Sequence, residues 1–284
     1  MDKKILIADS GSTKTDWCLI DTNSKKKQWQ TQGINPFFLQ ENEILSIFKN
    51  EMKVNPSKVQ IDEIHFYGAG VNSEDKKKII ERCLKQYFQC KKVKSYSDML
   101  ASAQATCLHN KGIACILGTG SNTCYYDGKK ISFKTQALGY VLGDEGGGTH
   151  IGKKILQYYL HDIFDKELKS AFEKQYKLVI PEILDSIYKK TFPNRFIAQF
   201  ANFAFEHRGH YMIENIAEDC LNDLFINHLL RYPQIHKLPV HFTGSVAFYL
   251  KNIIKNLCEQ YEVNYGSVLR KPIEGLIKFH TKKA

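Results

Sequence analysis

The sequence lacks the patterns that mark membrane proteins and disulfide frameworks. No apolar run approaches the length of a membrane span. The eight cysteines include no CxxC pair, and several lie in apolar, strand-like segments, where a reduced cysteine packs as a small hydrophobic side chain. The N-terminus carries no signal-peptide pattern. We therefore expect reduced thiols, a cytoplasmic location and no membrane partner.

Nucleic-acid signatures are also missing, although the chain is basic. The formal net charge is +10, which by itself leaves a nucleic-acid partner open. However, no RNP, zinc-finger or arginine-rich pattern occurs, and the lysines are spread over expected loops and helix surfaces. A solvated surface accounts for this charge better than a nucleic-acid groove does, so we expect no nucleic-acid partner.

What the chain does contain is a succession of short apolar runs and amphipathic segments. Its 284 residues are enough for one large or two ordinary domains, and no linker-like or low-complexity segment divides them. The pattern predicts strands at residues 4–8, 16–20, 27–31, 63–67, 93–96, 112–117, 123–126, 130–135 and 239–242. It predicts helices at residues 41–50, 74–88, 97–105, 153–165, 166–175, 180–188, 195–207, 212–231, 246–259 and from 272 onward. These elements indicate an α/β fold.

One arrangement occurs twice: a strand, a turn rich in glycine and hydroxyl groups, and a second strand. The turns are residues 9–15 (DSGSTKT) and residues 118–122 (GTGSN). Glycine lets a backbone approach a ligand, and exposed N–H and hydroxyl groups can hold phosphate oxygens. Asp9, at the end of the first strand, could hold a metal. Either turn alone fits an ordinary hairpin, but their repetition favours a polyphosphate gripped from two sides.

Four further features could carry chemistry, and each has a purely structural alternative. The glycine-rich segment 139–152 contains adjacent acids that could bind sugar hydroxyls, and the helix that follows could bind an anion; it could also be a structural loop. Residues 243–246 could lie against a planar ring or form a simple strand-to-helix turn. Asp98 could be a general base or a helix cap. Asn35 could bind substrate or shape a turn.

In this order the motifs resemble the actin-like ATPase superfamily of sugar kinases, heat-shock chaperones and actin. More narrowly, the chain resembles the BadF/BadG/BcrA/BcrD ATPase family and its N-acetylglucosamine kinase branch, over nearly its whole length. The resemblance is carried by ADSGSTKT, YGAG, YSDMLASAQA, LGTGSNT, LGYVLGDEGGGTHIG, FTGSVA and PIEGL. It implies two ribonuclease H-like domains around a central cleft. The N-terminal domain would be residues 1–106 joined by the C-terminal helix 272–284, and the C-terminal domain residues 107–271 with a helical insertion.

The resemblance also implies an ATP- and Mg²⁺-dependent kinase of an N-acetylated amino sugar, with N-acetylglucosamine 6-phosphate as the expected product. Asp98 would be the catalytic base and also contact the sugar. The nucleotide would be bound by Asp9, Gly11, Ser12, Thr13, Lys14, Gly118, Thr119, Gly120, Gly244, Ser245 and Val246, with Asp9 also holding Mg²⁺. The sugar side would comprise Asn35, Ser121, Asn122, Gly139, Tyr140 and Asp144. The segment 68–70 would be a hinge, and a homodimer is compatible with the resemblance.

Two departures from the family pattern leave alternatives open. The first turn reads DSGSTKT instead of DGGGTKT, which a small serine should tolerate. Tyr140 and Val141 replace the tryptophan and glycine of a GWG segment, so N-acetylmuramic acid or glucosamine could be the substrate instead. Other readings are an ATPase that activates a dehydratase or reductase, although no CAxGTG-type cysteine segment is present, and a sensor without turnover.

Overall fold

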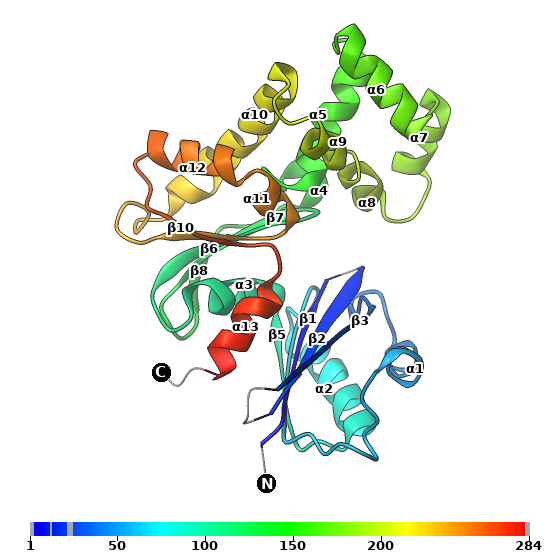
Figure 1. Ribbon diagram of the computed structural model, residues 1–284, viewed down its shortest axis with the longest axis vertical. Helices are drawn as coiled ribbons and strands as arrows, with labels where there is room; N and C mark the ends of the chain where they lie inside the picture. Colours follow the sequence, from blue (N-terminus) through cyan, green and yellow to red (C-terminus); the bar gives the residue numbers. More distant parts are fainter. Residues whose placement is uncertain (1–2, 12, 22–24, 282–284) are drawn as a thin grey trace. The chain divides into compact units, whose positions relative to one another are not determined.

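The computed structural model of the protein describes residues 3–11, 13–21 and 25–281 (Figure 1). These residues form two compact units, each with helices and one five-stranded sheet. Unit 1 comprises the chain up to Asn110, with Gly128–Lys130 and the segment from Lys271 onward, and unit 2 comprises Lys111–Asp127 and Ile131–Arg270. All eight cysteines are buried thiols. Within the described ranges, no helix combines the length and the apolar character needed to cross a membrane.

The sheet of unit 1 has the strand order β3-β2-β1-β4-β5. Its strands are β1 (Ile5–Ser10), β2 (Lys14–Ile20), β3 (Lys26–Gln32), β4 (Glu63–Gly68) and β5 (Lys92–Ser97). The first three strands form an antiparallel meander, whereas β4 pairs parallel to β1 and β5 parallel to β4. Trp17 and Trp29 stand opposite each other on β2 and β3 with ring centroids 6.2 Å apart, and this buried pair helps to fix the register.

Four helices complete unit 1: α1 (Glu41–Glu51), α2 (Glu74–Phe88), α3 (Asp98–Cys107) and α13 (Pro272–Thr281). The first two cover the sheet with apolar side chains, so that Phe48, Phe66 and Leu84 meet in one core. α3 packs against α13 and brings the end of the described chain onto unit 1 (Figure 1).

The contact between α3 and α13 depends on the missing side chain at Gly275. A Cβ atom there would lie 2.6 Å from the carbonyl carbon of Ala105 and 2.7 Å from its Cα. Because these are backbone atoms, no side-chain rotation relieves the overlap, and the helices would have to separate. We expect Gly275→Ala to lower the melting temperature by about 5 °C. The exposed neighbour Glu274→Ala should leave it unchanged, and equal melting temperatures for the two variants would refute this packing.

The sheet of unit 2 repeats the arrangement of the first. Its strands are β6 (Gly112–Leu117), β7 (Ser121–Tyr126), β8 (Ile131–Lys134), β9 (Val240–Thr243) and β10 (Tyr265–Leu269), in the order β10-β9-β6-β7-β8. β6 to β8 form an antiparallel meander, and β9 and β10 continue the sheet in parallel. The predicted internal repeat is therefore confirmed, and it extends beyond the turns to the topology of both sheets.

In the chain, the helices of unit 2 lie between β8 and β9 and between β9 and β10. They are α4 (Gly139–Leu142), α5 (Gly148–Leu160), α6 (Lys166–Tyr176), α7 (Ile180–Tyr188), α8 (Pro193–Ala198), α9 (Ala201–Glu206), α10 (Tyr211–Asn227), η1 (Leu229–Arg231), α11 (Ser245–Tyr249) and α12 (Lys251–Gln260). Figure 1 shows α6, α7 and α8 grouped on one side of α5, as a helical insertion.

Unit 2 differs from the prediction in several elements. The helix predicted at 212–231 ends at Asn227 and is followed by the separate η1 helix. The helices predicted at 195–207 and 246–259 are each divided in two, at Phe200 and Leu250. Both residues are fully buried, so the apolar periodicity continues across each break and hides it. β10 is absent from the sequence-based prediction because it is an edge strand that contains Gly266 and a register shift, which disturb the alternation of buried residues.

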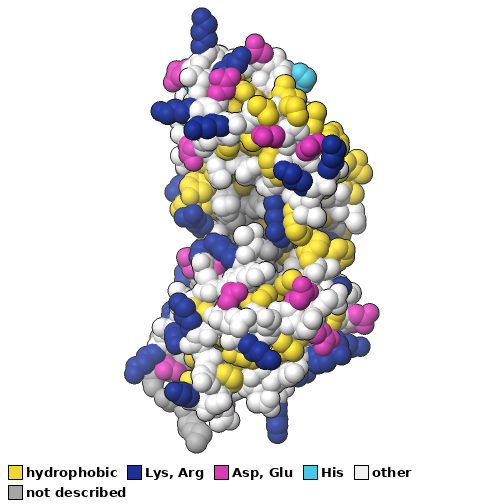
Figure 2. All heavy atoms as spheres, turned by 90° about the vertical axis from the view of Figure 1, so that its right-hand side faces the viewer, with side chains coloured by type: hydrophobic (Ala, Val, Ile, Leu, Met, Phe, Trp, Pro, Cys, Tyr) yellow, Lys and Arg dark blue, Asp and Glu magenta, His cyan; other side chains and the backbone are white. Residues whose placement is uncertain are grey.

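On the face of the molecule shown in Figure 2, basic side chains do not form a single patch. Lysine and arginine are scattered over it and interspersed with acidic side chains. This distribution resembles a solvated surface more than a continuous basic groove.

Candidate active site

The first predicted phosphate turn is a tight connection between β1 and β2. The Gly11 amide donates to the Lys14 carbonyl over 3.0 Å and closes the turn. Ser12 lies outside the described residues, whereas Gly11, Thr13 and Lys14 are all exposed. A Cβ atom at Gly11 would make only an ordinary 3.7 Å contact. The turn thus presents backbone and polar side chains to solvent, as a phosphate ligand requires.

Ser10 ties this turn to the loop that carries Asn35. Its buried hydroxyl accepts a hydrogen bond from the Ile34 amide over 2.9 Å and lies 2.7 Å from Thr15 Oγ1. Ser10 is one of two serines that replace glycines of the DGGGTKT pattern, and its role could not be predicted from its position in the turn. It joins the turn and the Asn35 loop into one hydrogen-bonded piece.

Three carboxylates gather near one end of the unit 1 sheet. Asp9 and Asp16 stand opposite each other on β1 and β2, a like-charge pair that destabilises a sheet. Burial, together with the charges of Asp16 and Asp98, raises the pKa of Asp9 to about 7. Lys271 donates to Asp16 Oδ1 over 3.0 Å and offsets part of the repulsion. This lysine is a further residue of the site that sequence reasoning missed.

The donor set around Asp9 fits the predicted Mg²⁺. In the described part of the chain, no group of three or more His, Cys, Asp or Glu side chains is arranged to hold a metal by itself. Magnesium in nucleotide-using enzymes commonly takes one or two carboxylates and completes its shell with water and phosphate oxygens. A cation beside Asp9 would also relieve the repulsion from Asp16. The metal-binding role of Asp9 stays a prediction.

Asp98 is the first residue of α3, but it is not the residue that caps this helix. The cap is Ser97, whose hydroxyl accepts a hydrogen bond from the Leu100 amide. Asp98 Oδ1 accepts a hydrogen bond from the Met99 amide over 2.8 Å, which orients the side chain at the end of β5. The alternative interpretation of Asp98 as a helix cap is therefore wrong. Its partly buried carboxylate remains a candidate general base.

Asn35 shapes a turn, which is one of the two roles predicted for it. Its Oδ1 accepts a hydrogen bond from the Phe37 amide over 2.9 Å. The segment after β4 packs closely on it, because Gly70 has a φ of +78° and a Cβ atom there would lie 2.9 Å from Asn35 Cγ. This geometry orients the amide and does not test whether Asn35 also binds a sugar.

The second predicted phosphate turn connects β6 to β7 and is held by the start of α5. The Gly118 amide donates to the Gly120 carbonyl over 3.0 Å. The first amides of α5, those of Gly148 and Thr149, donate to the carbonyls of Gly118 and Thr119, each over 2.8 Å. Because the turn already occupies these donors, the expectation that the start of α5 binds an anion is wrong.

The two glycines of this turn are present for different reasons. At Gly120 a Cβ atom would collide with the carboxylate of Asp144, 2.6 Å from its Cγ, so packing requires the glycine. At Gly118 no heavy atom lies within 4 Å of the Cβ position, and φ is not in the left-handed region. Neither packing nor backbone conformation requires glycine there, and the open space leaves room for a ligand close to the backbone.

We expect Gly118→Ala to weaken ATP binding by about tenfold, because the added methyl group fills the space into which a phosphate would fit. The melting temperature should change little, since the methyl group meets no described atom. Gly120→Ala is the matched contrast, because it should lower the melting temperature through the Asp144 collision. Isothermal titration calorimetry and thermal denaturation measure both effects. Unchanged ATP affinity in a folded Gly118→Ala protein would contradict the phosphate role of this turn.

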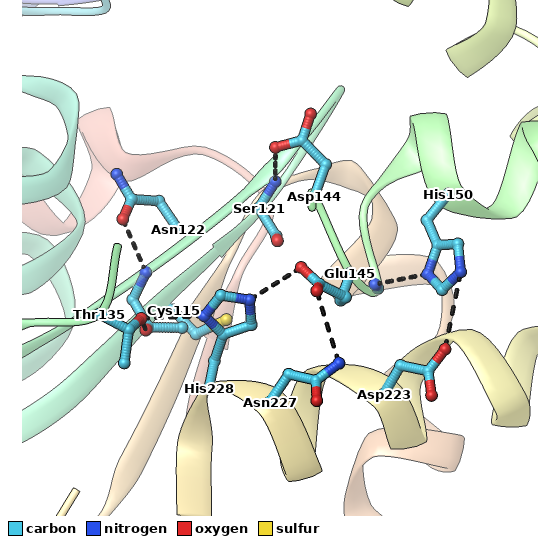
Figure 3. A network of polar contacts seen from close by, with 12 residues as sticks. Cys115, Ser121, Asn122, Thr135, Asp144, Glu145, His150, Asp223, Asn227 and His228 are labelled. Carbon is cyan, nitrogen blue, oxygen red and sulfur yellow. Dashed lines mark hydrogen bonds and ion pairs between the residues drawn. The ribbon is translucent and has the colours of Figure 1, made fainter. Parts of the chain in front are cut away.

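Asp144, on the glycine-rich segment, closes that segment onto the second turn. Its Oδ1 accepts a hydrogen bond from the Ser121 amide over 3.2 Å (Figure 3). Its Oδ2 accepts one from Thr149 Oγ1 over 3.4 Å. Burial raises the pKa of Asp144 above its ordinary value, although both hydrogen bonds oppose this. The structure thus brings together Ser121, Asn122 and Asp144, three residues predicted for the sugar side, and Asn122 accepts a hydrogen bond from the Thr123 amide over 2.9 Å.

Tyr140 and Gly139 lie in the short helix α4, in the exposed part of the glycine-rich segment. Gly139 has a φ of +72° and no heavy atom within 4 Å of its Cβ position. Leu138, Val141 and Leu142 beside them are all more than half exposed. The predicted sugar-side residues of unit 2 therefore divide into a half-buried, hydrogen-bonded anchor at Asp144 and a segment around the half-buried Tyr140 whose other residues are largely exposed.

The turn between β9 and α11 is explained by packing alone. Gly244 has a φ of +110°, and a Cβ atom there would lie 2.7 Å from the carbonyl carbon of Leu117. Val246 belongs to the buried core of unit 2, while Ser245 is exposed. The simple strand-to-helix turn accounts for Gly244 and Val246, and the contact of this turn with adenosine stays a prediction.

Comparison with known proteins identifies the class to which this fold and these turns belong. The model of the BadF/BadG/BcrA/BcrD ATPase family matches residues 8–274, and the chain belongs to this family. A solved structure from Porphyromonas gingivalis, named "putative N-acetylglucosamine kinase", is 38% identical, with 98% of each chain covered and a TM-score of 0.92. No curated protein matches the chain.

More distant structures share the fold alone. A Chromobacterium violaceum protein of the same printed name is 14% identical, with 98% of each chain covered and a TM-score of 0.74. MreB 5 of Spiroplasma citri is 10% identical, covers 98% of this chain and 96% of its own, and has a TM-score of 0.50. The predicted fold class, an α/β protein with two domains of the actin-like ATPase type, is confirmed.

Proposed function

We propose that the protein is a sugar kinase that transfers the γ-phosphate of ATP to an N-acetylated amino sugar, with N-acetylglucosamine as the acceptor and its 6-phosphate as the product. Family membership supports the use of ATP, and the 38% identity over 98% of the Porphyromonas gingivalis chain supports the kinase class. The observation that carries the proposal is geometric: the parallel register of β1, β4 and β5 places Asp9 level with Tyr96, so Asp98 begins α3 at the same end of the sheet. Its charge there contributes to the raised pKa of Asp9.

In this mechanism Asp98 is the general base. Its carboxylate accepts the proton of the sugar 6-hydroxyl as that oxygen forms a bond to the γ-phosphorus of ATP and the bond to the β,γ-bridging oxygen breaks. ADP leaves, and the proton passes from Asp98 to solvent. Phosphoryl transfer depends on positioning and charge neutralisation more than on covalent chemistry, so a fixed carboxylate is what the reaction requires.

The other predicted residues hold the reactants. Asp9 would hold Mg²⁺, which neutralises phosphate charge when bound, and Lys14 would add a positive charge at the first turn. The backbone and hydroxyl groups of residues 11–13 and 118–120 would bind phosphate oxygens. Asn35 in unit 1 and Ser121, Asn122, Gly139, Tyr140 and Asp144 in unit 2 would contact the sugar.

A coupled ADP-release assay over a panel of sugars tests this function. The panel contains N-acetylglucosamine, N-acetylmannosamine, N-acetylmuramic acid and glucosamine, because Tyr140 replaces the tryptophan of the family pattern. The proposal predicts ADP release that depends on N-acetylglucosamine and on Mg²⁺. Sugar-independent hydrolysis would support the activator ATPase instead, and absence of turnover with every sugar would support a sensor.

A further inference from the structure

His228 joins the two ends of the exposed segment 136–143, which we call the sugar-side segment. His228 follows the last residue of α10, and its ring lies between Thr135 and Glu145 in Figure 3. Its Nδ1 lies 2.9 Å from Thr135 Oγ1, and its Nε2 lies 2.8 Å from Glu145 Oε2. One side chain therefore contacts the residue before the segment and the residue shortly after it.

One assignment of donors and acceptors satisfies the whole chain of hydrogen bonds around His228. The Thr135 amide donates to the Tyr232 hydroxyl, which can donate to Thr123 Oγ1 at 2.8 Å. The Thr123 hydroxyl then donates to Thr135 Oγ1 at 2.7 Å, and the Thr135 hydroxyl donates to His228 Nδ1. With these directions His228 Nε2 donates to the Glu145 carboxylate, which as an ionised group can only accept. Every polar atom in the chain of hydrogen bonds then has a partner, so Thr135 and Glu145 are both tied to the same imidazole ring.

Glu145 is held as an ionised acceptor at the far end of this network. Burial is the largest single effect and raises its pKa, but the His228 hydrogen bond, a backbone hydrogen bond and the nearby charges of His228 and His150 together keep the pKa below the ordinary value. In a second contact, Asn227 Nδ2 donates to Glu145 Oε1 over 3.4 Å. The network therefore ends on a charged group that is anchored by two successive residues at the end of α10.

Within the described segment 136–143 no residue is buried. Leu138, Val141 and Leu142 are between 54% and 73% exposed, and within the segment the Gly143 amide donates to the Gly139 carbonyl over 2.8 Å. A segment with few buried contacts opens at low free-energy cost unless its ends are fixed. Its position relative to Asp144 therefore depends strongly on how its ends are held.

We propose that His228 is a positioning residue of the sugar site: by tying Thr135 to Glu145, it holds the segment that carries Gly139 and Tyr140 in a fixed relation to Asp144. This inference rests on the proposed function, because it assigns the segment to the sugar. His228 acts through its neighbours and need not touch the substrate. Its loss should therefore impair sugar binding while leaving the binding of ATP intact.

The first test measures the segment directly, without any substrate. Hydrogen–deuterium exchange of a peptide that covers residues 136–143 should be at least about tenfold faster in His228→Ala than in the original protein. His228→Gln should restore slow exchange, because its amide oxygen and nitrogen can replace the two ring nitrogens. His236→Ala is the matched control, since this histidine of unit 2 is exposed and the hydrogen bond given for its ring is to the Glu262 carbonyl, far from the sugar-side segment in sequence. Unchanged exchange in His228→Ala would overturn the proposal.

The second test is kinetic. His228→Ala should raise the KM for the sugar by about tenfold and leave the KM for ATP within about twofold, with rescue by His228→Gln. Thr135→Val and Glu145→Ala each remove one of the two bonds, so they serve if His228→Ala does not fold. When either substitution is combined with His228→Ala, the KM for the sugar should rise by no more than about a further twofold, because the histidine that the substituted residue contacts is already absent. Equal changes in both KM values would indicate a purely structural role and overturn the proposal.

These two measurements separate this inference from the proposed function. If the original protein phosphorylates no amino sugar, the kinase proposal fails, and the assignment of the segment to the sugar fails with it. The exchange experiment then still decides whether His228 holds the segment. If the sugar is phosphorylated but exchange and sugar KM do not respond to His228→Ala, the kinase stands and only the role of His228 is rejected.

Discussion

Replacing Asp98 with asparagine is expected to lower sugar-dependent ADP release by about a thousandfold, with ATP affinity changed by no more than about twofold. Asparagine keeps the size of the side chain and an oxygen that can accept the Met99 hydrogen bond, so α3 should begin as before. What is lost is a group that can take the proton from the sugar hydroxyl. The effect should therefore fall on the chemical step rather than on nucleotide binding.

The matched control for this variant is Asp75→Asn. Asp75 also lies in the first turn of a helix of unit 1, is exposed, and lies outside the predicted site. The Asp75→Asn substitution should change sugar-dependent turnover by no more than about twofold relative to the original protein. Near-normal turnover of Asp98→Asn, with ATP binding measured in parallel by calorimetry, would remove Asp98 from the mechanism.

Replacing Asp9 with asparagine is expected to abolish Mg²⁺-dependent turnover and, at the same time, to stabilise the protein in the absence of metal. The folded protein holds the pKa of Asp9 at about 7, above its ordinary value of 3.8, because of burial and of the charges of Asp16 and Asp98. Between these two pH values the folded state binds more protons than the unfolded state. The contribution of Asp9 to stability is therefore present at low pH and is lost as the pH rises toward 7.

The neutral amide of asparagine removes the unfavourable free energy of a buried, ionised Asp9. At pH 8 without Mg²⁺ the melting temperature of Asp9→Asn should therefore be about 2–4 °C above that of the original protein. At pH 4 the two proteins should melt alike, because Asp9 is then protonated in the folded state. Mg²⁺ with a nonhydrolysable ATP analogue should stabilise the original protein much more than the variant. A variant that melts lower than the original protein at pH 8, or that keeps Mg²⁺-dependent turnover, would contradict this account of Asp9.

The features that could be predicted from the sequence are those encoded within a few neighbouring residues. The two glycine-rich turns and their flanking strands occupy short stretches, so the repeat of strand, turn and strand could be recognised and the topology of both sheets bears it out. The helix breaks at Phe200 and Leu250 could not be predicted, because buried residues continue through them.

The features that escaped the sequence are those that join distant residues. Lys271 reaches Asp16 across 255 positions, and His228 reaches Glu145 across 83. No local pattern records such pairs. Ser10 escaped for a different reason: a serine in a turn has several uses, and only its contact with Ile34 shows which one applies. The residues that surround a predicted site are thus harder to infer than the site's own motifs.

The central claim is that this chain transfers phosphate to an amino sugar, and identification of the product tests it most directly. The protein should be incubated with ATP, Mg²⁺ and N-acetylglucosamine, and the mixture followed by phosphorus NMR. The account predicts a new phosphomonoester signal coupled to the protons on carbon 6 of the sugar, formed in step with ADP and absent with Asp98→Asn. ADP accompanied only by inorganic phosphate, at a rate independent of the sugar, would contradict it.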